Sequence, residues 1–278
     1  MINIKLYSEN RRILQIAIPS IISNITVPLL GLIDVTIVGH LGSPAYIGAI
    51  AVGGMLFNII YWIFGFLRMG TSGMTSQAYG QHDLNEINRL LIRSVGVGLF
   101  IALCLLILQY PILNAAFTLI QTTEEVKQLA TTYFYICIWG APAMLGLYGF
   151  AGWFIGMQNS RFPMYIAITQ NIVNIIASLS FVYLLDMKVA GVAAGTLIAQ
   201  YAGFFMAILL YMRYYSTLRK RIVWKDIIQK QAMYRFFRVN RDIFFRTFCL
   251  VIVTMFFTSA GAAQGEVVLA VNTLLMQL

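Results

Sequence analysis

One carboxylate stands alone inside a segment that is long enough and apolar enough to cross a membrane. Asp34 is the only ionisable side chain between Ile13 and Val38. A charged side chain at the centre of a membrane helix costs about 2.5–3.5 kcal/mol on insertion scales, so intramembrane acids usually face a cavity and have a function. Asp34 is therefore the first candidate for proton or cation coupling. The alternative is that it lies near a helix end and pairs with water or an arginine.

Two prolines precede this acid in the same segment. Pro19 and Pro28 each remove one backbone hydrogen bond and crowd the preceding turn, and Asp34 follows Pro28 by six residues. Burial disfavours the charged form of a carboxyl group, so a buried acid can exchange a proton near working pH. Together these features predict a helix that bends when its acid changes charge. The alternative is that the prolines only kink a packed helix.

A second polar group lies on the expected membrane span 163–185. Asn171, Asn174 and Ser178 are spaced by three and four residues, which places them on one helix face. Such a face either lines a cavity or bonds the helix to its neighbour, and the spacing leaves both readings open. Thr196, in the following span, is a weaker candidate for the same cavity because membrane threonines often bond their own backbone.

Arg68, at the end of the expected second span, has two interpretations. It extends toward the membrane interface, or it is the counter-charge of Asp34. The rest of the chain offers little for catalysis, since no phosphate loop, zinc signature or Ser/His/Asp arrangement occurs and there are only two histidines. The sequence therefore predicts no enzyme activity, no cofactor and no metal site.

The composition indicates a membrane protein. Hydrophobic residues make up 60% of the chain and charged residues 10%, against about 25% charged residues in a soluble domain. The net charge of +9 does not indicate nucleic-acid binding, because the basic residues lie between apolar spans. That distribution is typical of cytoplasmic loops next to a lipid bilayer.

Stretches of about 20 apolar residues mark the elements that must position these side chains. They predict an all-α membrane protein with seven spans and the beginning of an eighth. Because the chain stops inside the eighth, we expect the front part of a longer protein or a truncated chain. The expected spans are 13–38, 46–68, 91–109, 130–154, 163–185, 190–212, 243–262 and a last one from Val267.

The loop charges predict the orientation and the domains. Fifteen basic residues fall on one set of alternate loops, and only Lys127 and Lys188 fall on the other. The N-terminus is therefore expected in the cytoplasm. We expect a six-helix transmembrane lobe over 1–212, a basic cytoplasmic linker over 213–241, and the start of a second lobe over 242–278.

Several segments resemble the DinF-like branch of the MATE family of multidrug and toxic-compound extruders. The resemblance implies twelve helices in two six-helix lobes, of which this chain would hold the first lobe, helix seven and part of helix eight, with the rest of the C-terminal lobe missing. It also implies export of small cationic or amphipathic compounds by antiport with protons or sodium. The segments are PLLGLIDVTIVGHLG (28–42), FLRMGTSGMTSQAYG (66–80), GWFIGMQNSRFP (152–163), NRDIFFRTFCL (240–250) and the Asn-x-x-Asn of 171–174.

The resemblance also assigns roles to residues. The first-helix acid of the DinF-like branch, regarded as its coupling residue, matches Asp34, and its protonation is proposed to bend helix one. The polar cluster of the family maps onto Asn174 and Thr196. Relatives often carry a second acid where this chain has Ser178, and the stretch 248–262 lacks the glutamate of the sodium-coupled NorM-like branch. These departures favour H⁺ as the coupling ion, with Na⁺ as the alternative.

The expected function is thus a proton-coupled antiporter of the cell (inner) membrane that exports cationic or amphipathic drugs by alternating access. Two alternatives remain. A lipid-linked oligosaccharide flippase of the same superfamily should have a strongly cationic cavity, whereas intramembrane basic residues are scant here. A non-transporting membrane scaffold should tolerate the loss of Asp34.

Overall fold

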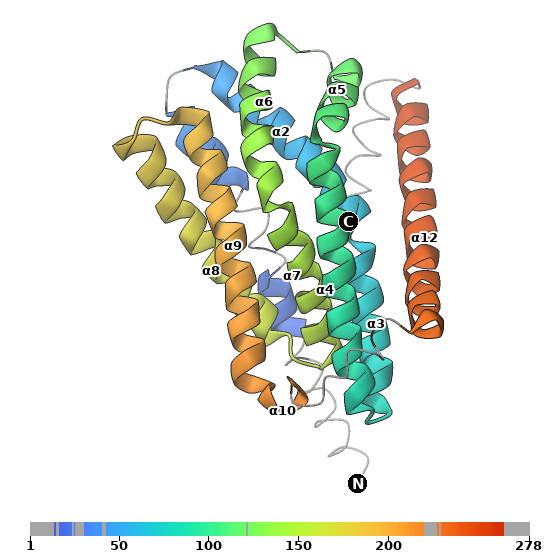
Figure 1. Cartoon of the computed structure of the whole chain (residues 1–278). Helices are drawn as coiled ribbons and strands as arrows, with labels where there is room; N and C mark the ends of the chain where they lie inside the picture. The colour runs from blue at the N-terminus through green and yellow to red at the C-terminus, as the bar shows by residue number, and fades with distance from the viewer. Residues whose placement is uncertain are drawn as a thin grey trace.

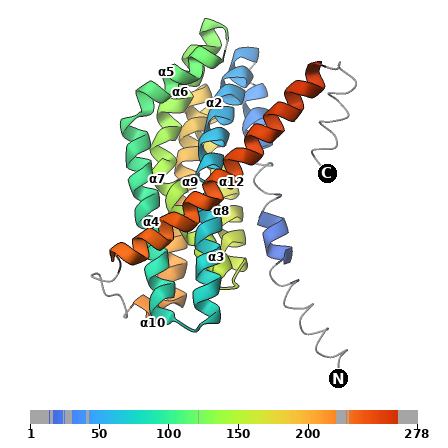
Figure 2. The same ribbon diagram turned by 90° about the vertical axis from the view of Figure 1, so that its right-hand side faces the viewer.

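The computed structural model describes residues 14, 17–23, 25, 31–40, 43–120, 122–219, 227 and 229–263. Over this part of the chain the fold is entirely helical, and most helices run side by side as a bundle (Figure 1). Turned by 90°, the molecule shows α12 crossing the outside of the bundle at a slant (Figure 2). The all-α membrane fold expected from the sequence is confirmed.

The helices of the bundle follow one another with short connections. Residues 31–39 are helical and hold Asp34. The remaining helices are α2 (Pro44–Ile63), α3 (Phe66–Gly80), α4 (Leu84–Ile107), α5 (Gln109–Leu119), α6 (Glu124–Cys137), α7 (Ala141–Gly156), α8 (Arg161–Leu179), α9 (Lys188–Tyr214), α10 (Ser216–Arg219) and α12 (Lys230–Ala263). A 3₁₀ turn (Ile138–Gly140) joins α6 to α7, and a π-helical turn (Ser180–Leu184) extends α8.

Five helical stretches of the described residues are long and apolar enough to cross a membrane. They are 44–80, 84–107, 124–156, 161–184 and 188–214, and each corresponds to one expected span. The first expected span is described only in part, and the eighth lies outside the described residues. α12 covers the expected seventh span but begins at Lys230 rather than 243.

The second span is longer than the sequence predicted because its polar half is also helical. α2 and α3 are separated only by Phe64 and Gly65, and helix continues to Gly80. The small residues of α3 lower its hydropathy but allow a close approach to α7. A Cβ placed on Gly156 of α7 would lie 2.8 Å from the carbonyl oxygen of Ser72 of α3. Small residues permit such close packing of membrane helices.

Left-handed residues close two of the tight turns between helices. His82, between α3 and α4, has φ 57°, and Gln158, between α7 and α8, has φ 59°. In both turns the following amide donates back to a carbonyl of the previous helix, from Asp83 to Ala78 at 3.0 Å and from Asn159 to Phe154 at 2.9 Å. This pattern satisfies carbonyls at a helix end. We call the end of the bundle that holds these two turns, and where α9 ends, the linker end.

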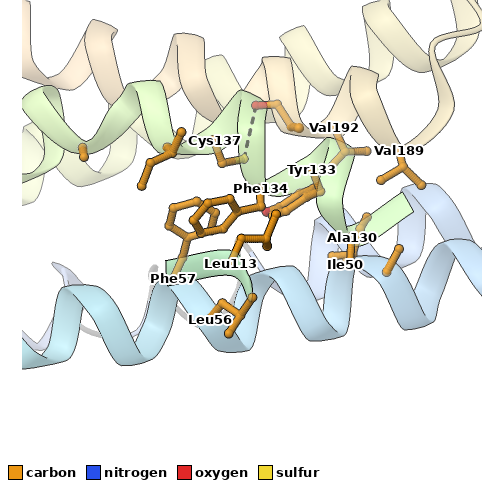
Figure 3. Close-up of a cluster of buried hydrophobic side chains, with 14 of the residues drawn as sticks. Ile50, Leu56, Phe57, Leu113, Ala130, Tyr133, Phe134, Cys137, Val189 and Val192 are labelled. Carbon is orange, nitrogen blue, oxygen red and sulfur yellow. Dashed lines mark hydrogen bonds between the residues drawn. The ribbon is translucent and has the colours of Figure 1, made fainter. Parts of the chain in front are cut away.

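Aromatic and aliphatic side chains fill the interior between the helices. In one cluster, side chains of α2, α5, α6 and α9 meet around Phe134 (Figure 3). The rings of Phe57 and Phe134 stack with centroids 5.3 Å apart. A second cluster, nearer the linker end, surrounds Trp153, whose indole N–H donates to the carbonyl oxygen of Ile87 at 2.8 Å. This packing fixes the positions of α6, α7 and α9 behind the polar residues.

Candidate functional site

Asp34 lies inside the bundle rather than at its surface. Its side chain is 3% exposed. The hydroxyl of Thr196 on α9 donates to Asp34 Oδ2 at 3.4 Å, and the side-chain amide of Asn174 on α8 donates to the same hydroxyl at 3.0 Å. Three helical segments thus bring together three of the residues that the sequence singled out, in a relay from Asn174 through Thr196 to Asp34.

The same cluster contains buried oxygen atoms without partners. Asp34 Oδ1, Asn174 Oδ1 and Ser178 Oγ have no hydrogen-bond partner among the described residues. Buried acceptors that stay unsatisfied cost about 1–3 kcal/mol each, so unpaired oxygens gathered in one place need a proton, water or a cation. The geometry offers Asp34 Oδ1 as the atom that exchanges such a partner.

The close packing of α8 against α9 positions this cluster. Ser178 faces Gly195, where an added Cβ would lie 2.7 Å from the backbone nitrogen of Ser178. Only glycine leaves room for the two helices to approach here. Asn174 and Ser178 are fully buried at this contact, whereas Asn171 is half-buried and makes contacts of its own.

α6 adds two residues that no pattern in the sequence singled out. Tyr133 and Cys137, one helical turn apart, are buried and interact electrostatically with Asp34. The thiol of Cys137 also donates to the carbonyl oxygen of Ala193 at 3.7 Å (Figure 3). Their period-four spacing was the available signal, but it is shared by every core position of an apolar helix.

Arg68 is not brought to Asp34. It is exposed, and it forms no ion pair with Asp34 in the described part of the chain. It lines a separate cavity together with Ser20 and Ser23. Pro19 is buried in the helical stretch just before these serines, and Pro28 lies outside the described residues. The bending of helix one therefore stays a prediction.

A bundle of apolar helices around a buried acid defines an all-helical, multi-pass membrane protein. The MatE family model matches residues 19–182. The chain therefore belongs to the MatE family.

A curated relative agrees with this assignment, and solved structures agree with the fold. The DNA damage-inducible protein F of Escherichia coli K12 is 35% identical over 98% of this chain. A MOP superfamily transporter from Pyrococcus furiosus superposes on 94% of this chain and 58% of its own, with TM-score 0.78 and 22% identity. The MATE transporter VcmN of Vibrio cholerae superposes on 96% of this chain and 60% of its own, with TM-score 0.79 and 20% identity. At these identities the two structures bear on the fold alone. This chain spans 60% of the length of the E. coli relative.

Proposed function

We propose that the protein is a secondary active transporter, not an enzyme, and that it exports small cationic or amphipathic compounds in exchange for protons. Membership of the MatE family supports the transport role, since its relatives include multidrug and toxin extrusion proteins. The observation that carries the coupling proposal is Asp34, which is buried, bonded through Oδ2 and unpaired at Oδ1 among the described residues.

Asp34 would couple the two fluxes by competition. A substrate cation interacts with the carboxylate only when it is ionised, and a bound proton removes that charge. Exchange then requires no further ionisable group, because each ligand displaces the other. One charge that crosses a membrane potential of 100 mV is worth about 2.3 kcal/mol, which sets the scale of the driving force for each charge that is moved.

The domain division and the orientation belong to the same proposal. Residues 1–212 would form the first lobe, 213–241 the connector and 242–278 the start of the second lobe. The protein would lie in the inner membrane of the cell, with its N-terminus in the cytoplasm. The loop charges support this orientation. Alternating access would open the cavity first to one side and then to the other.

An acid-to-amide pair tests the role of Asp34. The full-length protein is reconstituted in proteoliposomes, and uptake of a fluorescent organic cation is driven by an imposed pH gradient while proton flux is recorded. Asp34→Asn should reduce both fluxes to the level of empty liposomes. Asp242→Asn, which changes an exposed acid paired with Arg241, should leave them within about twofold of the unmodified protein.

Two further outcomes separate the alternatives. Full transport by Asp34→Asn would contradict the proposal and favour a scaffold or another coupling site. Cation uptake that follows an imposed Na⁺ gradient at constant pH, and that is lost in Asp34→Asn, would assign the coupling ion as Na⁺ instead of H⁺.

A further inference from the structure

Two arginines that the coupling site does not use meet at another cavity. Arg68, at the start of α3, and Arg246, in the middle of α12, are distant in sequence but line the same cavity of about 570 Å³. The cavity lies between α3, α7, α8 and α12 and extends to Ser160, at the linker end. Its volume falls within the range of small-molecule pockets, about 300–1,000 Å³.

The charge of this cavity is unbalanced. None of the described residues that line it is acidic, and neither arginine forms an ion pair with another described residue. The acids nearest to them in sequence have other partners. Asp83 accepts from the backbone amides of Asn85 and Glu86, and Asp242 pairs with Arg241. Cationic side chains within membrane helices face cavities or bind anions because they are costly elsewhere.

The remaining lining matches a molecule with one polar and one apolar part. Hydroxyl and amide groups of Ser20, Ser23, Ser72 and Gln170 line it alongside the arginines. Apolar side chains, among them Met69, Met144, Leu147 and Ile166, cover the other walls. A guanidinium group binds carboxylate, sulfonate or phosphate through two parallel hydrogen bonds. An anionic head with a hydrophobic body would satisfy both kinds of wall.

We propose that this two-arginine cavity binds an anionic amphiphile, whose charged group lies between Arg68 and Arg246. The site differs from the coupling cluster in its residues, because neither Asp34 nor Thr196 lines the cavity, although Gln170 lies only one helical turn from Asn174 along α8. The anion is either a soluble amphiphile or the headgroup of a membrane lipid. These two sources share the same chemistry and are separated by the experiment.

Binding of a dansylated alkyl sulfonate tests the site directly. The full-length protein is placed in phosphatidylcholine nanodiscs, and the sulfonate and the matched dansylated alcohol are titrated by fluorescence. Arg68→Gln and Arg246→Gln should each weaken sulfonate binding about tenfold, as expected for the loss of a hydrogen bond to a charged group. Arg213→Gln, which removes an exposed charge outside the cavity, should change it less than twofold. The alcohol should bind weakly and equally to all variants.

Further arms make the result specific. Arg68→Lys keeps the charge and should bind the sulfonate more tightly than Arg68→Gln does. Thermal unfolding of each variant identifies any that misfold. If a lipid headgroup is the natural occupant, adding phosphatidylglycerol should weaken sulfonate binding to the unmodified protein more than it weakens binding to the double Gln variant. If a soluble amphiphile is the natural occupant, the added lipid should affect the two proteins equally. Asp34→Asn should bind the sulfonate normally, so a failure of proton coupling would not affect this proposal. Equal sulfonate binding by the unmodified protein and a folded double variant would overturn it.

Discussion

At the scale of single residues, the two oxygens of one carboxylate have different surroundings. Oδ2 of Asp34 accepts from Thr196, while Oδ1 has no partner in the described part of the chain. Thr196 in turn is oriented by the amide of Asn174, which donates to it. The hydroxyl proton therefore points at the acid and not at the backbone of its own helix. Such an arrangement stabilises an ionised carboxylate on one side and leaves the other side for a ligand.

Removing that hydroxyl should weaken transport without removing the acid. Thr196→Val keeps the shape of the side chain but deletes the donor to Asp34. Because the bond is long, we expect a loss of about 1–1.4 kcal/mol, which corresponds to about a five- to tenfold lower initial rate of proton-driven uptake. Thr196→Ser keeps the hydroxyl and should stay near the unmodified rate. Equal rates for the Val and Ser variants would exclude a role for this hydroxyl.

At the scale of the elements, glycines set the distances between helices that carry the site. The backbone of α9 at Gly195 lies against Ser178 of α8, and the backbone of α7 at Gly152 lies against Arg68 of α3. Both contacts leave no room for a Cβ. Since packed interiors resist added volume, the relative positions of Thr196 and Asn174 depend on the first of these contacts.

Gly195→Ala should therefore destabilise the bundle and misplace the polar cluster. Overpacking of this kind costs about 1–3 kcal/mol, which should lower the unfolding temperature in detergent and reduce transport together. Gly96→Ala is the matched control, because nothing lies within 4 Å of a Cβ at that helical position. It should be neutral or stabilise α4 by about 0.5–1 kcal/mol. Equal melting temperatures of both variants would show that α8 and α9 can separate freely.

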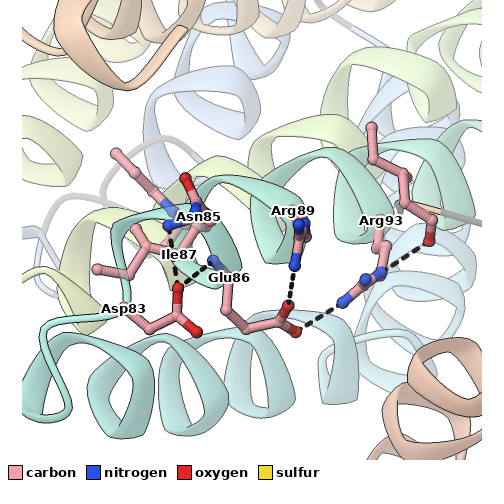
Figure 4. A network of polar contacts seen from close by, with 8 residues as sticks. Asp83, Asn85, Glu86, Ile87, Arg89 and Arg93 are labelled. Carbon is pink, nitrogen blue, oxygen red and sulfur yellow. Dashed lines mark hydrogen bonds and ion pairs between the residues drawn. The ribbon is translucent and has the colours of Figure 1, made fainter. Parts of the chain in front are cut away.

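At the scale of the whole molecule, the segment that leads from α9 to α12 is tied to the bundle. Asn88 of α4 donates to the carbonyl oxygen of Leu218 at 3.0 Å, and Arg93 Nε donates to that of Ile227 at 2.8 Å. Arg93 is buried and also pairs with Glu86 at 2.6 Å (Figure 4). These contacts give the expected linker a fixed attachment at each of two points.

Loss of the second attachment should expose the basic segment to protease. Arg93→Gln removes the donor to Ile227 and one partner of Glu86, so we expect trypsin to cleave between residues 219 and 230 about fivefold faster or more. That factor corresponds to about 1 kcal/mol, the lower end of the cost of an unmade buried hydrogen bond. Arg89→Gln removes a partly exposed partner of the same acid at 3.8 Å. Exposed pairs contribute about 0–1 kcal/mol, so cleavage of this control should change little.

Local patterns were sufficient for the helical class, and they selected Asp34 as the candidate acid. Apolar runs of membrane length predicted the spans, because no backbone other than a helix or a closed barrel satisfies its hydrogen bonds in lipid. The single charge in 13–38 singled out Asp34, and the spacing of Asn174 and Ser178 placed them on one face. The helical extension to Gly80 was missed, since Ser, Thr and Gly lower the hydropathy of a stretch in which packing nevertheless buries Gly70, Thr71 and Thr75.

What belongs to the sequence alone is the chemical type of each residue and the helix that carries it. Which helices meet was decided by tertiary packing, because contacts between distant segments depend on shape and not on local spacing. Only the structure placed Thr196 against Asp34, brought Tyr133 beside the same acid and moved Arg68 away from it to a cavity shared with Arg246. Arg68 shows the difference most clearly, since its charge was readable from the sequence but its neighbours were not.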